Sequence, residues 1–560
     1  AYLGGDALGG AINLITNKRH VNFVDASLSA GSFGTYIADV NAQYKLPDTH
    51  IVLRPSVGVS YSKNNYTMKN VELWSDEQSK FYETDVDRFH DKYFSVLAQM
   101  EAGIEHTSWA DELFVTLSYN KVDKELQTGQ IQSIVYGEAK RKQDSWSLAA
   151  RYRKHDFLVK NLDLNMLLSH TWDHQVTVDS AYRKYAWDAT WIPTTRNEIT
   201  GRSKLMRHYK RPLLTLRTNL NYKFNEEHSL NLNYMMYHNG NERYDDLDKE
   251  FEPSNDHLTK HIVGLSYNQV LMQERMVNTL FVKDYVNHTN IEQNDYYWIT
   301  NADDVPRTST KSYLGYGLGT RYTFCEPLSV KASFEHTARL PLSREMLGNG
   351  TTIYANLALK PENSDNVNVG LFGNVRLGNH LLNYEVNGFY RHIKDYIHAV
   401  LSESEGMIQY DNVAGVDMKG VEGEVRYSWR DMVQLTSNIT WQDARDKNKL
   451  KADGKPSITY DNKVPNRPWL FSNTELTLTK HDVMGKDTRI RLNYLYQYVH
   501  WFYLTWEGYG SLSTKSRIPT QNIHSAMLTF SWQKERYNLS LECNNTSRSE
   551  ERRVGKECRS

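Results

Sequence analysis

The sequence predicts an all-β protein, a large antiparallel transmembrane β-barrel of about 22 strands in the intact protein, of which about 21 are visible in these 560 residues. Three observations support this prediction. Apolar and polar side chains alternate along many segments, short and long connections between the segments alternate, and no run of about 18 apolar residues exists that would form a transmembrane helix. Tyrosine and tryptophan are also abundant, with 37 and 13 residues, as the interfaces of a membrane barrel require.

One stretch shows the alternation most clearly. In residues 489–498 the even positions are isoleucine, leucine and three tyrosines, whereas Arg489, Arg491 and Asn493 occupy the other face. Successive side chains of a strand point to opposite faces, so this segment is a strand with an aromatic face and a polar face. In a membrane barrel the first contacts lipid and the second lines a wet lumen. Similar segments are 214–222, 382–391, 421–429 and 537–543.

The connections between these segments are sorted by length. Outer-membrane barrels have short periplasmic turns and long external loops, so every second connection is expected to lie outside the cell. We count 21 segments ending near Asn545, and because such barrels have an even number of strands, one strand is expected to be missing. Segment 489–498 is the nineteenth and rises toward the exterior. The short turns lie near 46–50, 106–111, 155–161, 225–228, 272–275, 324–327, 377–379, 429–432, 480–486 and 533–535, and the longer connections near 63–91, 123–143, 174–209, 239–258, 291–310, 340–363, 399–416, 446–466 and 500–519.

The composition excludes several classes of function. The chain has 66 basic and 67 acidic residues, so no charge excess indicates a nucleic-acid partner. The three cysteines, Cys325, Cys543 and Cys558, lack metal-ligand spacing, and no other cluster has it. No Ser, His and Asp arrangement at suitable strand positions indicates a hydrolase. We therefore expect no catalytic residues, no cofactor and no metal site.

The first residues carry a resemblance to a known family. Residues 4–18, GGDALGGAINLITNK, form a glycine-rich turn that leads into a short β segment and lacks the end of a phosphate-binding loop. Through Gly9, Gly10 and Asn13 this segment resembles the end of the plug domain of TonB-dependent outer-membrane receptors. The resemblance implies that residues 1–18 are the last part of a plug, and that the rest of the plug and the TonB-contacting segment are missing from this sequence.

Later motifs resemble the same family. Arg339 and Pro341 resemble its arginine-proline element. Residues 356–364, NLALKPENS, resemble its Asn-Pro-x-Leu-Lys-Pro-Glu-x-Ser element, with leucine at position 357 where the family has proline. The matching positions of this element are Lys360, Pro361 and Glu362, and residues 412–424 and 464–468 resemble two further elements.

These resemblances divide the chain into three parts. Residues 1–18 are the plug remnant and residues 19–546 are the receptor β-barrel. Residues 547–560, SRSEERRVGKECRS, abandon the alternation for a charged run without any aromatic residue. We interpret this run as a tail outside the family, of artefactual coding sequence; the alternative is a genuine disordered basic tail.

The resemblance implies the function of an active-transport receptor in the outer membrane of a Gram-negative bacterium. Such a receptor is surrounded by outer-membrane lipid, captures a small-molecule or oligomeric nutrient, uses energy from the TonB complex, and in some cases works with a surface lipoprotein. An iron-siderophore is the default cargo, and glycan, peptide or cobalamin uptake stays open. Haem is disfavoured, because residues 341–355 lack the histidine that similar haem receptors place there.

Two groups of residues are candidates for function. Charges that recur on one face of a strand are costly in a dry core, so Glu422, Glu424, Arg426, Arg489 and Arg491 are expected to face the lumen and the plug. For Glu422 and Glu424 a structural role is favoured over acid-base catalysis. The candidates for ligand contact in or beside external loops are Tyr297, Trp298, Arg339, Trp506 and Tyr509, and for Arg339 with Glu345 we favour a role in ordering their loop.

Three alternatives belong to other classes of protein. A passive porin or structural barrel is disfavoured by the plug-like residues 4–18, since a porin has no use for an N-terminal plug. A barrel hydrolase lacks its catalytic residues. A soluble carbohydrate-binding β protein does not explain why short and long connections alternate.

Overall fold

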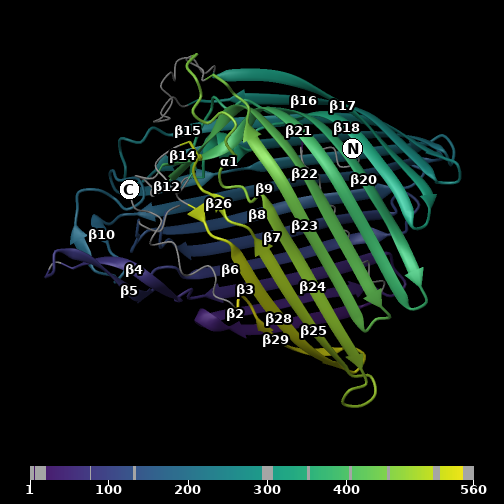
Figure 1. Cartoon of the computed structure of the whole chain (residues 1–560), viewed down its shortest axis with the longest axis horizontal. Coiled ribbons are helices and arrows are strands. Elements are labelled where there is room, and N and C mark those ends of the chain that lie inside the picture. Colours follow the sequence, from purple (N-terminus) through teal and green to yellow (C-terminus); the bar gives the residue numbers. More distant parts are fainter. Residues whose placement is uncertain are drawn as a thin grey trace.

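The computed structural model describes residues 5–6, 21–75, 77–129, 134–292, 307–349, 353–402, 407–450, 454–508 and 517–546. Nearly all of the secondary structure in these ranges is β-strand, and the largest sheet joins 23 strands (Figure 1). The predicted all-β class is therefore confirmed. The described part of the chain contains no helix long and apolar enough to cross a membrane.

Apart from the two-residue strand β19 (Ile353–Tyr354), which pairs in parallel, the strands of the large sheet pair antiparallel with their neighbours in chain order. β12 and β13 are separated by two residues and pair with the same two neighbours, β9 and β14, so they form one interrupted strand. With β19 left aside and β12 and β13 counted once, the 23 strands of the sheet form 21 strand positions in the described residues, as the sequence predicts. The strands are β1 (Phe23–Gly31), β2 (Thr35–Lys45), β3 (Ile51–Ser62), β6 (Tyr93–Glu105), β7 (Glu112–Glu125), β8 (Lys140–Lys154), β9 (Leu162–Asp179), β12 (Leu205–Lys210), β13 (Leu213–Lys223), β14 (His228–Asp245), β15 (Ser254–Leu271), β16 (Met276–Asn290), β17 (Thr308–Cys325), β18 (Leu328–Arg339), β20 (Glu362–Leu377), β21 (His380–Ser402), β22 (Met407–Trp429), β23 (Val433–Asp446), β24 (Leu470–His481), β25 (Arg489–Val499), β28 (Gln521–Trp532) and β29 (Tyr537–Cys543).

The two ends of this series run in the same direction. Each strand is antiparallel to the one before it, so the first position, β1, and the twenty-first, β29, are parallel to one another. In the described residues no ladder joins β29 to β1. The segment predicted as the nineteenth strand is β25, which holds that position.

The long connections contain structure that the sequence did not indicate. One holds the hairpin β4 (Thr67–Ser75) with β5 (Lys80–Asp87), another the hairpin β10 (Arg183–Tyr185) with β11 (Trp191–Pro193), and a third the pair β26 (Phe502–Tyr503) with β27 (Arg517–Ile518). The expected loop 399–416 is mostly a paired ribbon, because the ladder of β21 and β22 continues to Ser402 and Met407.

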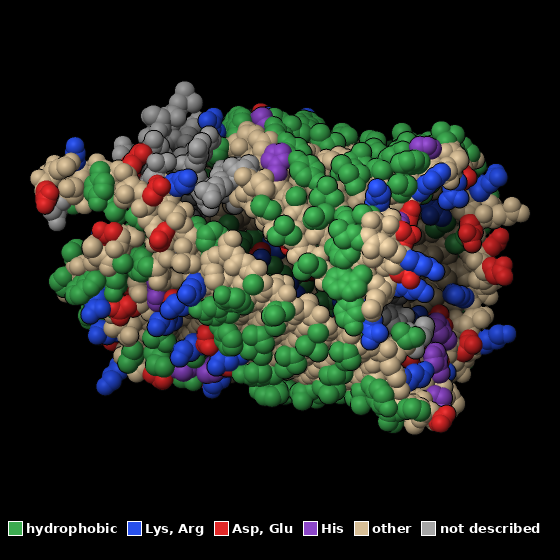
Figure 2. Space-filling model, turned by 90° about the horizontal axis from the view of Figure 1, so that it is seen from below, with side chains coloured by type: hydrophobic (Ala, Val, Ile, Leu, Met, Phe, Trp, Pro, Cys, Tyr) green, Lys and Arg blue, Asp and Glu red, His purple; other side chains and the backbone are tan. Residues whose placement is uncertain are grey.

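The outer face of the sheet carries an apolar band. On β20 the residues Val367, Val369 and Leu371 are 43–52% exposed, whereas the alternate residues Ser364 and Asn366 are at most 2% exposed. Figure 2 shows hydrophobic side chains gathered over the middle of the strands and charged side chains toward both ends. The outward positions of β20 from 367 to 375 span about 27 Å along the strand, which at a tilt of about 40° corresponds to a height of about 20 Å, most of the ~25 Å apolar band of outer-membrane barrels.

A row of ionisable side chains borders this band on the side of the long loops. His336 of β18, Asp365 of β20, His392 of β21 and Asp417 of β22 are register partners on four adjacent strands. His336 Nδ1 lies 2.7 Å from Asp365 Oδ1, and His392 Nδ1 lies 2.6 Å from Asp417 Oδ1. Because charged groups are costly in hydrocarbon, this row indicates where the apolar band ends.

Candidate gate at the external mouth

The connection between β18 and β20, residues 340–361, folds into the mouth of the barrel, and we call it the strap. It contains the short helix α1 (Ser343–Leu347) and the two-residue strand β19 (Ile353–Tyr354). The helix begins where Glu345 Oε2 accepts the Leu342 N–H at 2.8 Å. It ends at Gly348, whose φ of 72° favours glycine and where a Cβ would lie 2.6 Å from the Ile353 carbonyl.

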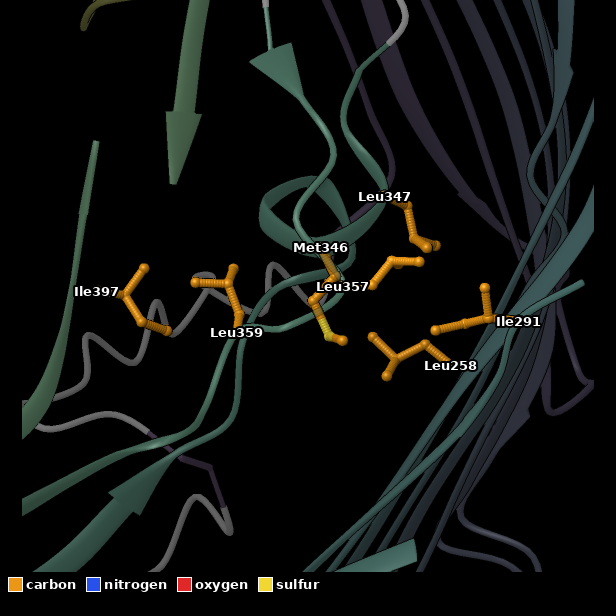
Figure 3. Close-up of a cluster of buried hydrophobic side chains, with 7 residues drawn as sticks. All are labelled: Leu258, Ile291, Met346, Leu347, Leu357, Leu359 and Ile397. Carbon is orange, nitrogen blue, oxygen red and sulfur yellow. The ribbon is translucent and has the colours of Figure 1, made fainter. Parts of the chain in front are cut away.

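Apolar side chains of the strap pack against two walls of the barrel. On one wall lie Leu258 of β15 and Ile291, which follows β16, and on the other lies Ile397 of β21 (Figure 3). Deeply buried side chains on a segment between two walls fix it across the lumen. The strap residues in this cluster are Met346, Leu347, Leu357 and Leu359, all 4–8% exposed.

Hydrogen bonds attach the strap to distant strands. Gln175 of β9 donates to the Asn349 carbonyl at 3.1 Å. On the other side β19 pairs in parallel with Ile408 and Gln409 of β22, and Asn356 donates to the Tyr410 carbonyl at 2.8 Å. These partners belong to the seventh and sixteenth strand positions, so the strap crosses the mouth from wall to wall.

A buried ion-pair network holds both ends of the strap. Arg339, the last residue of β18, contacts Glu345 Oε2 at 3.1 Å and Glu362 Oε1 at 3.0 Å. Glu345 and Glu362 are 4% and 3% exposed, and Glu362 also accepts the Ile397 N–H at 2.8 Å. The guanidinium thus joins α1 to the first residue of β20. This geometry supports a role for Arg339 in ordering the strap.

Two buried lysines lie beneath the start of the strap. Lys260 of β15 is 6% exposed and its Nζ lies 3.5 Å from Asp6 Oδ2 and 3.1 Å from the Leu340 carbonyl. The same Asp6 oxygen accepts the Leu340 N–H at 3.2 Å. Lys283 of β16, also 6% exposed, donates to the Gly5 carbonyl at 3.4 Å. Residues 5–6 are therefore bound to the barrel wall and to the strap at one place.

One carboxylate joins two external loops through hydrogen bonds. Glu198, in the connection after β9, accepts the backbone N–H groups of Gly137, Glu138 and Ala139 at 2.7, 3.0 and 2.8 Å. Burial raises the pKa of Glu198 to about 6, against the effect of these hydrogen bonds, and the charge of Asp179 adds to the rise. Glu198 therefore joins the loop after β7 to the loop after β9.

Trp506 lies inside the mouth rather than at the tip of a loop. Its ring is 5.8 Å from the ring of His398 and it packs on a buried cluster that includes Phe389 and Val416. A small surface pocket nearby is lined by Lys463, Val464, Pro465, Arg467, Trp469, Trp501, Phe502, Tyr503 and Glu507. The contact of Trp506 with a ligand stays a prediction.

The remaining candidates lie in three places. Glu424 and Arg426 face the lumen near the periplasmic turn after β22, where Arg426 Nε is 2.5 Å from Glu424 Oε1, and Glu422 shares their face. Arg489 pairs with Glu535 of the last periplasmic turn, and Arg491 is on the same face of β25. Pro341 and Pro361 belong to the strap. The backbone N–H of Lys360 donates to the Asn412 side chain, and the Lys360 carbonyl accepts a hydrogen bond from it. Outside the described residues lie Gly9, Gly10, Asn13, Tyr297, Trp298, Tyr509 and the tail 547–560.

Sequence reasoning missed the residues that anchor the strap to the walls. Lys260, Leu258 and Gln175 are spaced by strand alternation like many other lumen-facing residues, and only their partners distinguish them. The one available signal was that Lys260 occupies the same face as the buried Leu258 and Ile262. Among the described residues, no group of three or more His, Cys, Asp or Glu side chains is placed to hold a metal ion.

A large antiparallel sheet with an apolar outer band, a polar inner face and a strap across its mouth is the architecture of a large membrane β-barrel. A family model, TonB dependent receptor-like, beta-barrel, matches residues 136–545, and the chain belongs to this family. TonB-dependent receptors are transporters rather than enzymes, and members of the family are outer-membrane proteins of Gram-negative bacteria.

Solved structures show the same fold at low sequence identity. The copper transporter OprC aligns with a TM-score of 0.68 and 13% identity over 94% of this chain and 74% of that one. The siderophore receptor PiuA from Acinetobacter baumannii aligns with a TM-score of 0.64 and 13% identity over 94% of this chain and 78% of that one. The FrpB iron transporter (F3-3 variant) from Neisseria meningitidis aligns with a TM-score of 0.63 and 13% identity over 94% of this chain and 76% of that one. No curated protein sequence matches the chain.

Proposed function

We propose that this protein is an outer-membrane receptor that imports an iron-siderophore with energy supplied through TonB. The observation that carries the proposal is the strap, which crosses the mouth and is buried against both walls. A passive pore needs an unobstructed path, whereas a cargo that passes this mouth requires the strap or its neighbours to move. The family membership supports TonB as the energy source.

The choice of cargo is supported by similarity of fold. The similar structures are named as an iron transporter, a siderophore receptor and a copper transporter. Iron is the more frequent cargo among them, and residues 341–355 contain no histidine for a haem iron. A passive porin or structural barrel is the second candidate.

Uptake of a radioactive ferric siderophore by cells that express the receptor tests this function. We expect uptake that disappears when the TonB complex is deleted. Uptake that persists without TonB would support a passive barrel, and failure of a panel of ferric chelates to enter, with a different nutrient imported, would contradict the iron cargo.

A crosslink tests the gate itself. Ile353 of the strap and Ile408 of β22 are register partners, and ladder partners lie within reach of a disulfide. The double variant Ile353→Cys/Ile408→Cys, once oxidised, is expected to block uptake, and a reducing agent is expected to restore it. The two single-cysteine variants serve as controls. Full uptake by the oxidised double variant would show that the strap does not gate the path.

A further inference from the structure

We infer that Lys260, with the Leu340 N–H and Lys283 beside it, forms a seat for an anionic group, which Asp6 occupies in the closed state and an anionic cargo occupies when residues 5–6 move away. This inference rests on the proposed transport function and specifies the charge of the cargo. The seat already binds a carboxylate, since Asp6 Oδ2 contacts Lys260 Nζ at 3.5 Å and accepts the Leu340 N–H at 3.2 Å.

The burial of Lys260 makes an anion necessary at this place. The side chain is 8% exposed, and an ammonium removed from water is stable only when it is paired. The two other buried carboxylates at this end of the strap, Glu345 and Glu362, are already paired with Arg339. Asp6 is therefore the carboxylate in direct contact with Lys260 within the described residues.

Lys283 adds a second positive charge with a weak partner. Its Nζ lies 3.9 Å from Glu335 Oε1 and 3.4 Å from the Gly5 carbonyl, and its side chain is 7% exposed. When residues 5–6 leave, this lysine loses the Gly5 carbonyl at the same time as Lys260 loses Asp6. Both ammonium groups and the Leu340 N–H then lose a partner, and donors of these kinds suit a carboxylate or a catecholate oxygen.

The seat is also joined to the strap. Leu340 is the first strap residue, its N–H contacts Asp6 and its carbonyl contacts Lys260. Displacement of Asp6 removes a hydrogen bond from the base of the strap. An anionic group that replaces Asp6 therefore binds in the lumen directly at the base of the strap.

Binding of two ferric chelates of opposite charge tests the seat. The full chain is folded in detergent, and tryptophan fluorescence is titrated with an anionic ferric tris-catecholate and with a cationic ferric trihydroxamate. We expect Lys260→Gln to weaken binding of the anionic chelate about tenfold, the loss typical of one charge-assisted contact, and Lys260→Arg to retain it. Asp6→Asn removes the competitor and is expected to tighten that binding several-fold. We expect none of these three substitutions to change binding of the cationic chelate.

Lys331→Gln is the matched control. Lys331 is a luminal lysine of β18 that pairs with Glu385 at 2.5 Å, away from the strap. Equal effects of Lys260→Gln and Lys331→Gln would overturn the seat, because the loss would then reflect luminal charge in general. Heat-modifiable migration in gels confirms that each variant is folded.

A second measurement separates the seat from the iron cargo. If neither chelate binds to the unchanged protein, the proposed function fails, yet the seat is still tested by the ion selectivity of Asp6→Asn in planar bilayers with citrate salts. We expect a preference for the anion that is lost in Asp6→Asn/Lys260→Gln and kept in Asp6→Asn/Lys331→Gln. The same selectivity in both double variants would overturn the inference.

Discussion

Two luminal arginines show how burial changes the role of one chemical group. At the external mouth Arg339 contacts two glutamates that are almost completely buried. Near the periplasmic end Arg426 contacts one glutamate, and the two side chains are 64% and 37% exposed. The sequence places both on polar faces of strands with the same alternation. The difference indicates that the mouth is a packed structural unit, whereas the lower lumen wall of this chain is open to solvent.

The largest expected effect is at Arg339. Arg339→Met leaves Glu345 and Glu362 buried without their cation, which costs about 3–5 kcal/mol. Hydrogen exchange of the α1 amides should report this loss as faster exchange of the strap while the strands stay protected. The triple variant Arg339→Met/Glu345→Gln/Glu362→Gln removes the unpaired charges and is expected to recover much of the protection. Unchanged exchange in Arg339→Met would remove the distinction between the two arginines.

The apolar contacts of the strap come next. Leu357→Ala removes a side chain that is 8% exposed between the two walls, with an expected loss of about 2–4 kcal/mol in the stability of the closed strap. Leu377→Ala, at an outward position 71% exposed, is the matched control, and we expect a change below about 0.5 kcal/mol. Protease cleavage within the strap measures both, and equal cleavage rates would contradict the packing.

The strands were predictable from the sequence because their signal is local. Segment 489–498 alternates residue by residue and became β25 at the predicted nineteenth position. The strap was not predictable, because its five-residue helix and two-residue strand depend on partners far along the chain. Gln175 and Asn349 are 174 positions apart, and Lys260 and Asp6 are 254 apart. No periodicity of one segment encodes such pairs, although the motif resemblance did single out Arg339, Glu345 and Glu362.

In the external loops, the pH is expected to change the stability of the hydrogen bonds that Glu198 accepts. Burial raises the pKa of this carboxyl to about 6, above its ordinary value of 4.5. A raised folded-state pKa contributes stability that is fully present below about pH 4.5 and is lost as the pH rises through about 6. Hydrogen exchange at Gly137, Glu138 and Ala139 is therefore expected, after correction for intrinsic rates, to show stronger protection at pH 5 than at pH 7.5. Glu198→Gln should remove this difference, and a pH dependence that survives the substitution would assign it to another group.

The smallest expected effect is at Arg426, and it tests the wet side of the comparison. An exposed ion pair is screened by water and must immobilise two long side chains, so its contribution is typically below 1 kcal/mol even when the contact is short. Arg426→Gln should therefore shift the denaturation midpoint very little. A double-mutant cycle with Glu424→Gln isolates the pair, because each single variant also changes contacts with water. A coupling of several kcal/mol would mean that this part of the lumen is as dry as the mouth, and the burial of Arg339 would then no longer distinguish the two regions.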